Sequence, residues 1–121
     1  MAERYSSFRA GSTRWFLQRI TAAFLVVTLA FHFYLVHFLH PAPQITFGGS
    51  AGRFSVPSYF VTMVLFLGAA TFHGVNGVYN ALVNQGVEGT PLRAAKWVLA
   101  VAGVLLFVQG VRVALALAGG A

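Results

Sequence analysis

Three long apolar runs, separated by short polar stretches, make up most of the chain. The runs cover about residues 15–39, 57–85 and 92–118. A helix needs roughly 20 apolar residues to cross the ~30 Å of hydrocarbon in a bilayer, and each run is long enough. The pattern therefore predicts an all-α integral membrane protein, a bundle of three transmembrane helices in a single domain over residues 1–121.

Prolines and glycines separate the runs. The segment HPAP at residues 40–43 ends the first run, and three glycines follow it before the second. Because such residues favour turns and irregular backbone, we expect an exposed loop over residues 41–56. Pro57 stands at the start of the second run, where proline suits the first turn of a helix. A short turn is expected from Gly86 to Pro91.

The composition supports a membrane protein and excludes several kinds of chemistry. Charged residues are 8% of the chain and hydrophobic residues 58%, whereas a soluble domain carries about 25% charged residues. A soluble enzyme is therefore excluded. The two acids, Glu3 and Glu88, lie outside the runs, so paired-carboxylate chemistry has no basis. Because the chain has no cysteine, histidine would have to hold any metal centre.

The basic residues indicate the orientation of the bundle. Six of the eight lie around the start of the first run or just past the second: Arg4, Arg9, Arg14, Arg19, Arg93 and Lys96. The positive-inside rule then places the N-terminus in the cytoplasm and the C-terminus outside. These residues are not interleaved with aromatic side chains on a polar face, so no nucleic-acid partner is predicted. The abundant alanine, valine, glycine and arginine favour a prokaryotic plasma membrane.

His73, in the middle of the second run, is a candidate metal ligand. Its neighbours one turn away on the same helix face are Ala69 and Gly77. Small residues above and below a histidine leave a flat gap in which a haem could lie against the backbone. The same pattern also suits a close helix–helix contact with a hydrogen bond from the histidine. The residues alone leave both interpretations open.

His32, in the first run, is a second candidate at a different depth. It lies about 20 Å beyond Arg19 along a helix, and His73 lies about 16 Å from Asn84 at the cytoplasmic end of its own run. The two histidines then suit separate centres. Since a haem with two histidine ligands would find only one here at each depth, the other would come from a second chain. The remaining two histidines are interpreted as interface residues.

Two stretches of the chain resemble a known family. LQRIT at residues 17–21, followed by His32, and FHGVNGVYNAL at residues 72–82 are similar to the cytochrome b membrane anchor of succinate dehydrogenase and fumarate reductase. The resemblance covers about residues 15–85. Its specificity lies in the order: an arginine, a histidine in the first helix, then a histidine–glycine stretch in the second.

The resemblance implies a subunit that is not catalytic by itself. Such anchors dock a flavoprotein and an iron–sulfur subunit, and they support electron transfer from succinate to membrane quinone. One or two b haems would be shared with a second hydrophobic anchor chain. An anchor of quinol:fumarate reductase is an alternative. A further alternative is a non-redox structural or transport-accessory subunit whose histidines only hydrogen-bond between helices.

The resemblance also assigns roles to single residues. His73 matches the axial ligand of the haem nearer the cytoplasm, and His32 matches that of the outer haem in two-haem members. Arg19 matches an arginine that pairs with a haem propionate, and its alternative role is a snorkelling anchor at the membrane interface. Ala69 and Gly77 would pack against the haem.

Quinone contacts are assigned more weakly. Some one-haem members carry an Asp-Tyr pair at the end of the second helix, whereas this chain has Asn84 and Gln85 there. Either amide could donate a hydrogen bond to a quinone carbonyl, but neither is an acid. Arg14, Ser6 and Ser7 are further weak candidates at the cytoplasmic rim.

Overall fold

The computed structural model describes residues 12–119, and three long helices dominate this range. They are α2 (Thr13–Tyr34), α4 (Pro57–Asn84) and α5 (Gly89–Ala118). Within the described range these are the helices long and apolar enough to cross a membrane, and no strand occurs there. The predicted all-α bundle of three spanning helices is confirmed.

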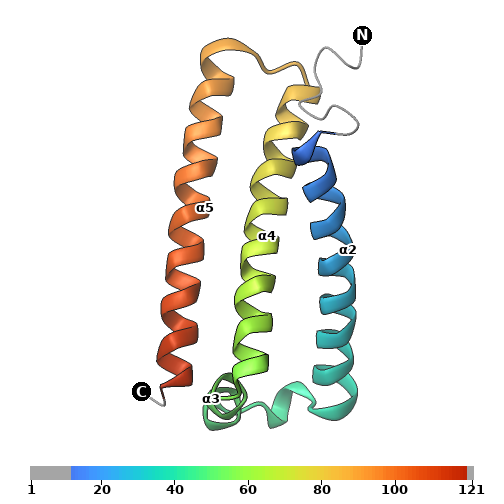
Figure 1. Cartoon of the computed structure of the whole chain (residues 1–121), viewed down its shortest axis with the longest axis vertical. Coiled ribbons are helices and arrows are strands. Elements are labelled where there is room, and N and C mark those ends of the chain that lie inside the picture. Colours follow the sequence, from blue (N-terminus) through green and yellow to red (C-terminus); the bar gives the residue numbers. More distant parts are fainter. Residues whose placement is uncertain (1–11, 120–121) are drawn as a thin grey trace.

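The second spanning helix, α4, is the centre of the bundle. It packs against both α2 and α5, which flank it on opposite sides (Figure 1). Three passes place the start of α2 and the end of α5 at opposite ends of the bundle. This agrees with the predicted topology, while the assignment of one end to the cytoplasm stays a prediction.

The first helix has a defined start and end. Ser12 caps α2 by accepting a hydrogen bond from the backbone N–H of Trp15 over 3.2 Å. At its other end α2 continues into a single π-helical turn, Leu35–Leu39. Pro41 follows, and because proline disfavours helical backbone in the residue before it, the helix ends at this point. The helical segment therefore reaches residue 39, where the apolar run ends.

The predicted exposed loop over residues 41–56 is wrong in its backbone. A 3₁₀ turn, Ala42–Gln44, and a short helix, α3 (Phe47–Phe54), form there. Glycine weakens a helix by about 1 kcal/mol relative to alanine, which is why the sequence suggested a loop. Thr46 offsets part of this by capping α3 through the N–H of Gly49. The rest comes from packing, because α3 contacts both α4 and α5.

The turn between α4 and α5 is shorter than predicted. Gly86 and Gly89 have positive φ angles of 85° and 65°, in the left-handed region that favours glycine. Helix α5 begins at Gly89 rather than near residue 92. Pro91 therefore lies in its first turn, where a missing N–H breaks no helical hydrogen bond.

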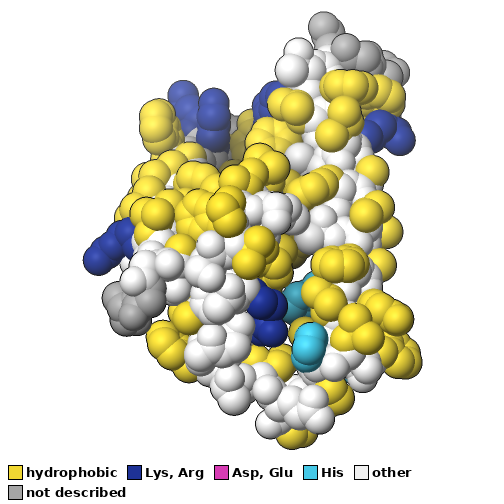
Figure 2. All heavy atoms as spheres, turned by 60° about the horizontal axis from the view of Figure 1, so that its bottom comes forward, with side chains coloured by type: hydrophobic (Ala, Val, Ile, Leu, Met, Phe, Trp, Pro, Cys, Tyr) yellow, Lys and Arg dark blue, Asp and Glu magenta, His cyan; other side chains and the backbone are white. Residues whose placement is uncertain are grey.

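Small residues bring α5 close to α4. A Cβ atom on Gly103 would lie 2.9 Å from Val75 Cγ2, and one on Gly110 would overlap the side chain of Leu67. Most large apolar side chains instead face outward, as Figure 2 shows over much of one face. Leu106, for example, is 67% exposed. An outward apolar surface with small residues between helices is typical of packing in lipid.

Candidate functional site

The two sequence stretches that carry the family resemblance meet at His73. This half-buried histidine lies on α4 with its Nδ1 3.2 Å from the hydroxyl oxygen of Thr21 on α2. The backbone oxygen of His73 accepts a hydrogen bond from the side-chain amide of Gln18 over 3.3 Å. Both the ring and the backbone of His73 are thus held by the LQRIT stretch.

A buried amide extends this contact along the helices. Asn76 is 4% exposed. Its Nδ2 donates to Gln18 Oε1 over 3.0 Å, and its Oδ1 accepts from the guanidinium of Arg14 over 2.7 Å. We call Arg14, Gln18, Thr21, His73 and Asn76 the polar network. Its contacts join α2 to α4 through the ring of His73 and through the side-chain amides of Gln18 and Asn76.

The polar network was not predicted, although the sequence contains its signal. Arg14, Gln18 and Thr21 recur at spacings of four and three, so they share one face of a helix. His73 and Asn76, three residues apart, share a face of α4. A polar face on each of two apolar helices indicates that the two faces pair. The register between the helices, however, cannot be predicted from either run alone.

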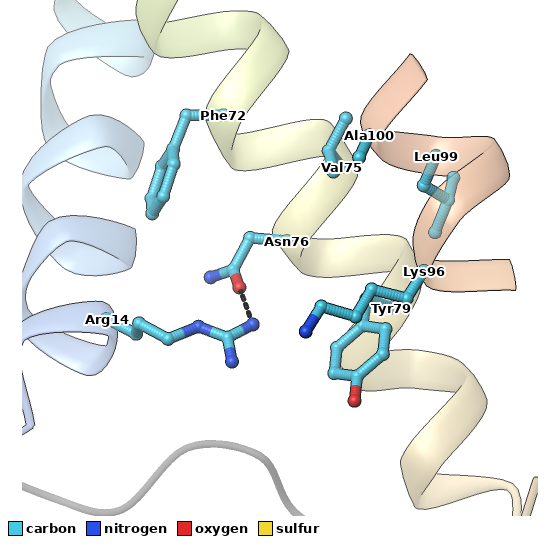
Figure 3. Close-up of a pocket in the computed structure, with 8 residues that line it drawn as sticks. All are labelled: Arg14, Phe72, Val75, Asn76, Tyr79, Lys96, Leu99 and Ala100. Carbon is cyan, nitrogen blue, oxygen red and sulfur yellow. Dashed lines mark hydrogen bonds between the residues drawn. The ribbon is translucent and has the colours of Figure 1, made fainter. Parts of the chain in front are cut away.

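A cavity of about 200 Å³ lies beside Asn76. Arg14 approaches it from α2, and the other lining residues come from α4 and α5 (Figure 3). It is lined by Arg14, Phe72, Val75, Asn76, Tyr79, Lys96, Leu99 and Ala100. The guanidinium of Arg14 lies 5.5 Å from the centre of the Tyr79 ring. With two cations and a phenol but no carboxylate in its lining, the cavity suits a ligand that accepts hydrogen bonds.

The small neighbours of His73 face two different surroundings. A Cβ on Gly77 would lie 3.5 Å from Gln18 Nε2, so Gly77 lies against the polar network. Ala69 lies in an apolar groove of about 490 Å³. The groove residues are Leu17, Ile20, Thr21, Phe24, Val64, Leu65, Gly68, Ala69, Phe72 and Phe107. Of the two predicted haem-packing residues, Gly77 therefore faces α2 and Ala69 faces the groove.

Arg19 lies apart from the polar network. Its guanidinium stacks 4.3 Å from the centre of the Trp15 ring, and the residue is exposed. Because it follows Gln18 directly, it points about 100° round α2 from that side chain. The structure does not bring Arg19 to His73, and its contact with Trp15 fits the interpretation of an interfacial anchor.

Of the weak quinone candidates, Arg14 lines the cavity beside Asn76, whereas Asn84 and Gln85 do not. Asn84 and Gln85 are exposed at the end of α4. Tyr79 is the lining residue nearest this end of α4. From Tyr79 to Asn84 the helix rises about 8 Å. Ser6 and Ser7 lie outside the described residues.

His32 lies at the other end of the bundle. From Thr21, which contacts His73, to His32 the helix rises about 16 Å, so the two histidines are at different levels. His32 lines a small hollow of about 30 Å³, together with Leu35, Val36, His40, Ile45, Arg53 and Tyr59. Figure 2 shows basic and histidine side chains facing this hollow. His32 thus shares its surroundings with a cation that the sequence did not single out.

Three further contacts occur at this end of the bundle. The half-buried Arg53 donates to Ser50 Oγ over 3.3 Å. His37 stacks on Phe33 with ring centres 4.0 Å apart, and its Nδ1 lies 3.1 Å from the oxygen of that residue. Within residues 12–119 no three histidine or acidic side chains come together as a metal-binding group.

Comparison with known proteins identifies the family. The chain matches the succinate dehydrogenase/fumarate reductase transmembrane subunit family over residues 2–111. It belongs to this family. A relative from the archaeon Thermoplasma acidophilum, described as succinate dehydrogenase hydrophobic membrane anchor subunit, is 26% identical over 118 residues. That alignment covers 98% of this chain and 95% of the relative. No solved structure matches the chain.

The family match confirms the resemblance drawn from LQRIT and FHGVNGVYNAL. In this succinate dehydrogenase/fumarate reductase anchor subunit, the matched range contains the whole polar network and the hollow at His32. The three spanning helices and the family together make it a multi-pass membrane protein.

Proposed function

We propose that this anchor subunit binds haem b through His73 and supports electron transfer from succinate to membrane quinone. The observation that carries the proposal is the environment of the His73 ring. Its Nδ1 lies within hydrogen-bond distance of Thr21, while its Nε2 has no hydrogen-bond partner among residues 12–119. The imidazole is half-buried and is held on one side only. It is therefore suited to act as the histidine ligand that haem iron takes from a protein. Haem, when bound, supplies a one-electron carrier.

A second anchor chain completes the proposed site. Among the described residues His73 is the single histidine at its level, so a second histidine ligand would come from outside this chain. The apolar groove beside Thr21 and Ala69, and the exposed apolar side chains around it, offer a surface for such a chain. The flavoprotein and the iron–sulfur subunit would dock at the predicted cytoplasmic end, where Arg14 and Lys96 lie.

His32 is proposed as the ligand of a second haem nearer the outside. Arg53 supports this, because it lines the same hollow and its side chain donates a hydrogen bond to the neutral hydroxyl of Ser50. A guanidinium pairs well with a carboxylate, so Arg53 would hold a propionate of that haem. Arg19, by contrast, could reach a propionate only on the face of α2 that carries Trp15.

The cavity at Arg14 is proposed to receive the quinone head group. Its donors, the guanidinium of Arg14, the ammonium of Lys96 and the hydroxyl of Tyr79, suit the carbonyl oxygens of a quinone. Asn84 and Gln85 do not line this cavity and are not assigned this role. The same arrangement serves quinol:fumarate reductase, in which electrons flow in the opposite direction.

One spectrum separates this proposal from a non-redox helical subunit. The complex, purified with its soluble subunits and partner anchor, should show a b-type band in the reduced-minus-oxidised difference spectrum. His73→Ala should remove one haem, since an axial ligand is lost. His37→Ala, a histidine stacked on Phe33 near the helix end, is the matched control and should retain all haem. Full haem content in the His73→Ala complex contradicts the proposal.

A further inference from the structure

The hydroxyl of Thr21 lies within hydrogen-bond distance of three atoms, two backbone oxygens and one ring nitrogen. Besides lying 3.2 Å from His73 Nδ1, it donates toward the backbone oxygens of Leu17 at 2.8 Å and Gln18 at 3.1 Å. A hydroxyl carries one proton and two lone pairs. The shorter contact to Leu17 is the usual bond of a helical threonine to the carbonyl four residues earlier. The proton is therefore used within α2, and a lone pair faces His73.

We infer that Thr21 is a positioning residue that sets the tautomer of His73. With its proton committed to the helix backbone, Thr21 accepts from His73, so the imidazole carries its hydrogen on Nδ1. The lone pair then resides on Nε2. This is the nitrogen without a partner among the described residues, and it is the state that an iron ligand needs. The inference rests on the proposed haem ligation by His73.

The same hydrogen bond should tune the iron. An acceptor at Nδ1–H makes the imidazole a stronger base and fixes the ring orientation, as outer-shell partners of metal-bound histidines do. A stronger base favours the ferric over the ferrous state. Removing the acceptor should therefore raise the midpoint potential of this haem and leave the orientation of the His73 ring less fixed.

Three variants of the assembled complex test the inference. Thr21→Val removes the hydroxyl while keeping the branched shape, and Thr21→Ser restores an acceptor. Thr28→Val is the matched control, because Thr28 is buried on α2 and bonds to the oxygen of Phe24 over 2.8 Å in the same way, without a histidine. The readouts are the redox titration of each haem and the low-spin electron paramagnetic resonance signal, which reports the orientation of the axial imidazoles.

Thr21→Val should shift the potential of one haem to a more positive value, move its resonance signal and weaken haem retention about 10-fold. Thr21→Ser and Thr28→Val should resemble the wild type in all three measurements. If Thr21→Val does not assemble, Thr21→Ala removes the same acceptor with less bulk and should give the same shifts.

Two results overturn the inference. The first is an unchanged potential and resonance signal in a Thr21→Val complex with full haem content. The second is an equal shift in Thr21→Val and Thr28→Val, which would assign the effect to packing. A wild-type complex without haem would instead overturn the proposed function, and the inference with it. A complex that holds haem but shows no Thr21 effect rejects the inference alone.

Discussion

Arg14 and Asn76, 62 positions apart in the chain, are joined by a hydrogen bond of 2.7 Å between α2 and α4. The Asn76 side chain is buried, and its nitrogen donates to Gln18 in turn. A polar side chain inside a membrane protein is costly unless it is paired. The two bonds therefore favour one register between the helices, and that register places His73 opposite Thr21.

Replacing Asn76 should destabilise the bundle. Asn76→Leu keeps similar bulk but removes the acceptor of Arg14 and the donor to Gln18 Oε1. Hydrogen bonds between membrane helices contribute about 1–2 kcal/mol each at most. We expect a lower midpoint of thermal unfolding for the purified complex. Asn84→Leu, at the exposed end of the same helix, is the control. Equal midpoints for the two variants would show that the network does not hold α2 to α4.

Gly103 should not tolerate a larger side chain. Because a Cβ there would lie 2.9 Å from Val75 Cγ2, Gly103→Val must push α5 away from α4, at a cost of about 1–3 kcal/mol. Ala102→Val places the same side chain on the exposed face one residue earlier. The measurement is the yield and thermal stability of the detergent-solubilised complex. A Gly103→Val complex as stable as Ala102→Val is the result that contradicts close α4–α5 packing.

Arg14 should affect the use of quinone without affecting haem content. A charge-assisted hydrogen bond contributes about 1.5–3 kcal/mol, so Arg14→Gln should reduce kcat/KM for quinone by about tenfold or more. Arg93→Gln removes a cation at the same end that donates to Thr90 and does not line the cavity. Steady-state assays over a range of quinone concentrations, with haem quantified in parallel, make the comparison. If both variants lose the same activity, general surface charge is the cause.

Arg53 should matter for the outer haem alone. Losing the partner of a propionate weakens haem binding, so Arg53→Gln should lower the retention of the haem assigned to His32 and leave the haem of His73 in place. Arg112→Gln is the control, because Arg112 is an exposed arginine in the last two turns of α5 and bonds to Gln109. Pyridine haemochrome assays give the haem content of each complex. A Arg53→Gln complex with both haems at wild-type potentials contradicts the assignment.

The sequence predicted the membrane-spanning helices better than the segments that connect them. Pro57 and the long charge-free run after it marked α4, since lipid requires a long, mainly apolar helix whatever its neighbours are. The glycine-rich segment of α3 was predicted as a loop, because intrinsic propensity ignores the contacts that α3 makes with α4 and α5. Arg19 was matched to a propionate by its place in the motif; in the structure its guanidinium lies over Trp15, and its role toward haem stays a prediction.

The sequence by itself determined that this protein is a three-helix membrane anchor with a histidine in each of its first two spans. Apolar length and charge asymmetry are local properties, so no partner helix was needed to read them. Only the tertiary structure decided which polar residues pair: Asn76 with Arg14 and Gln18, and His73 with Thr21. The physical reason is that a buried hydrogen bond needs a donor and an acceptor from two helices at one depth. The depth of each polar side chain and the direction in which it points are fixed only when the helices pack.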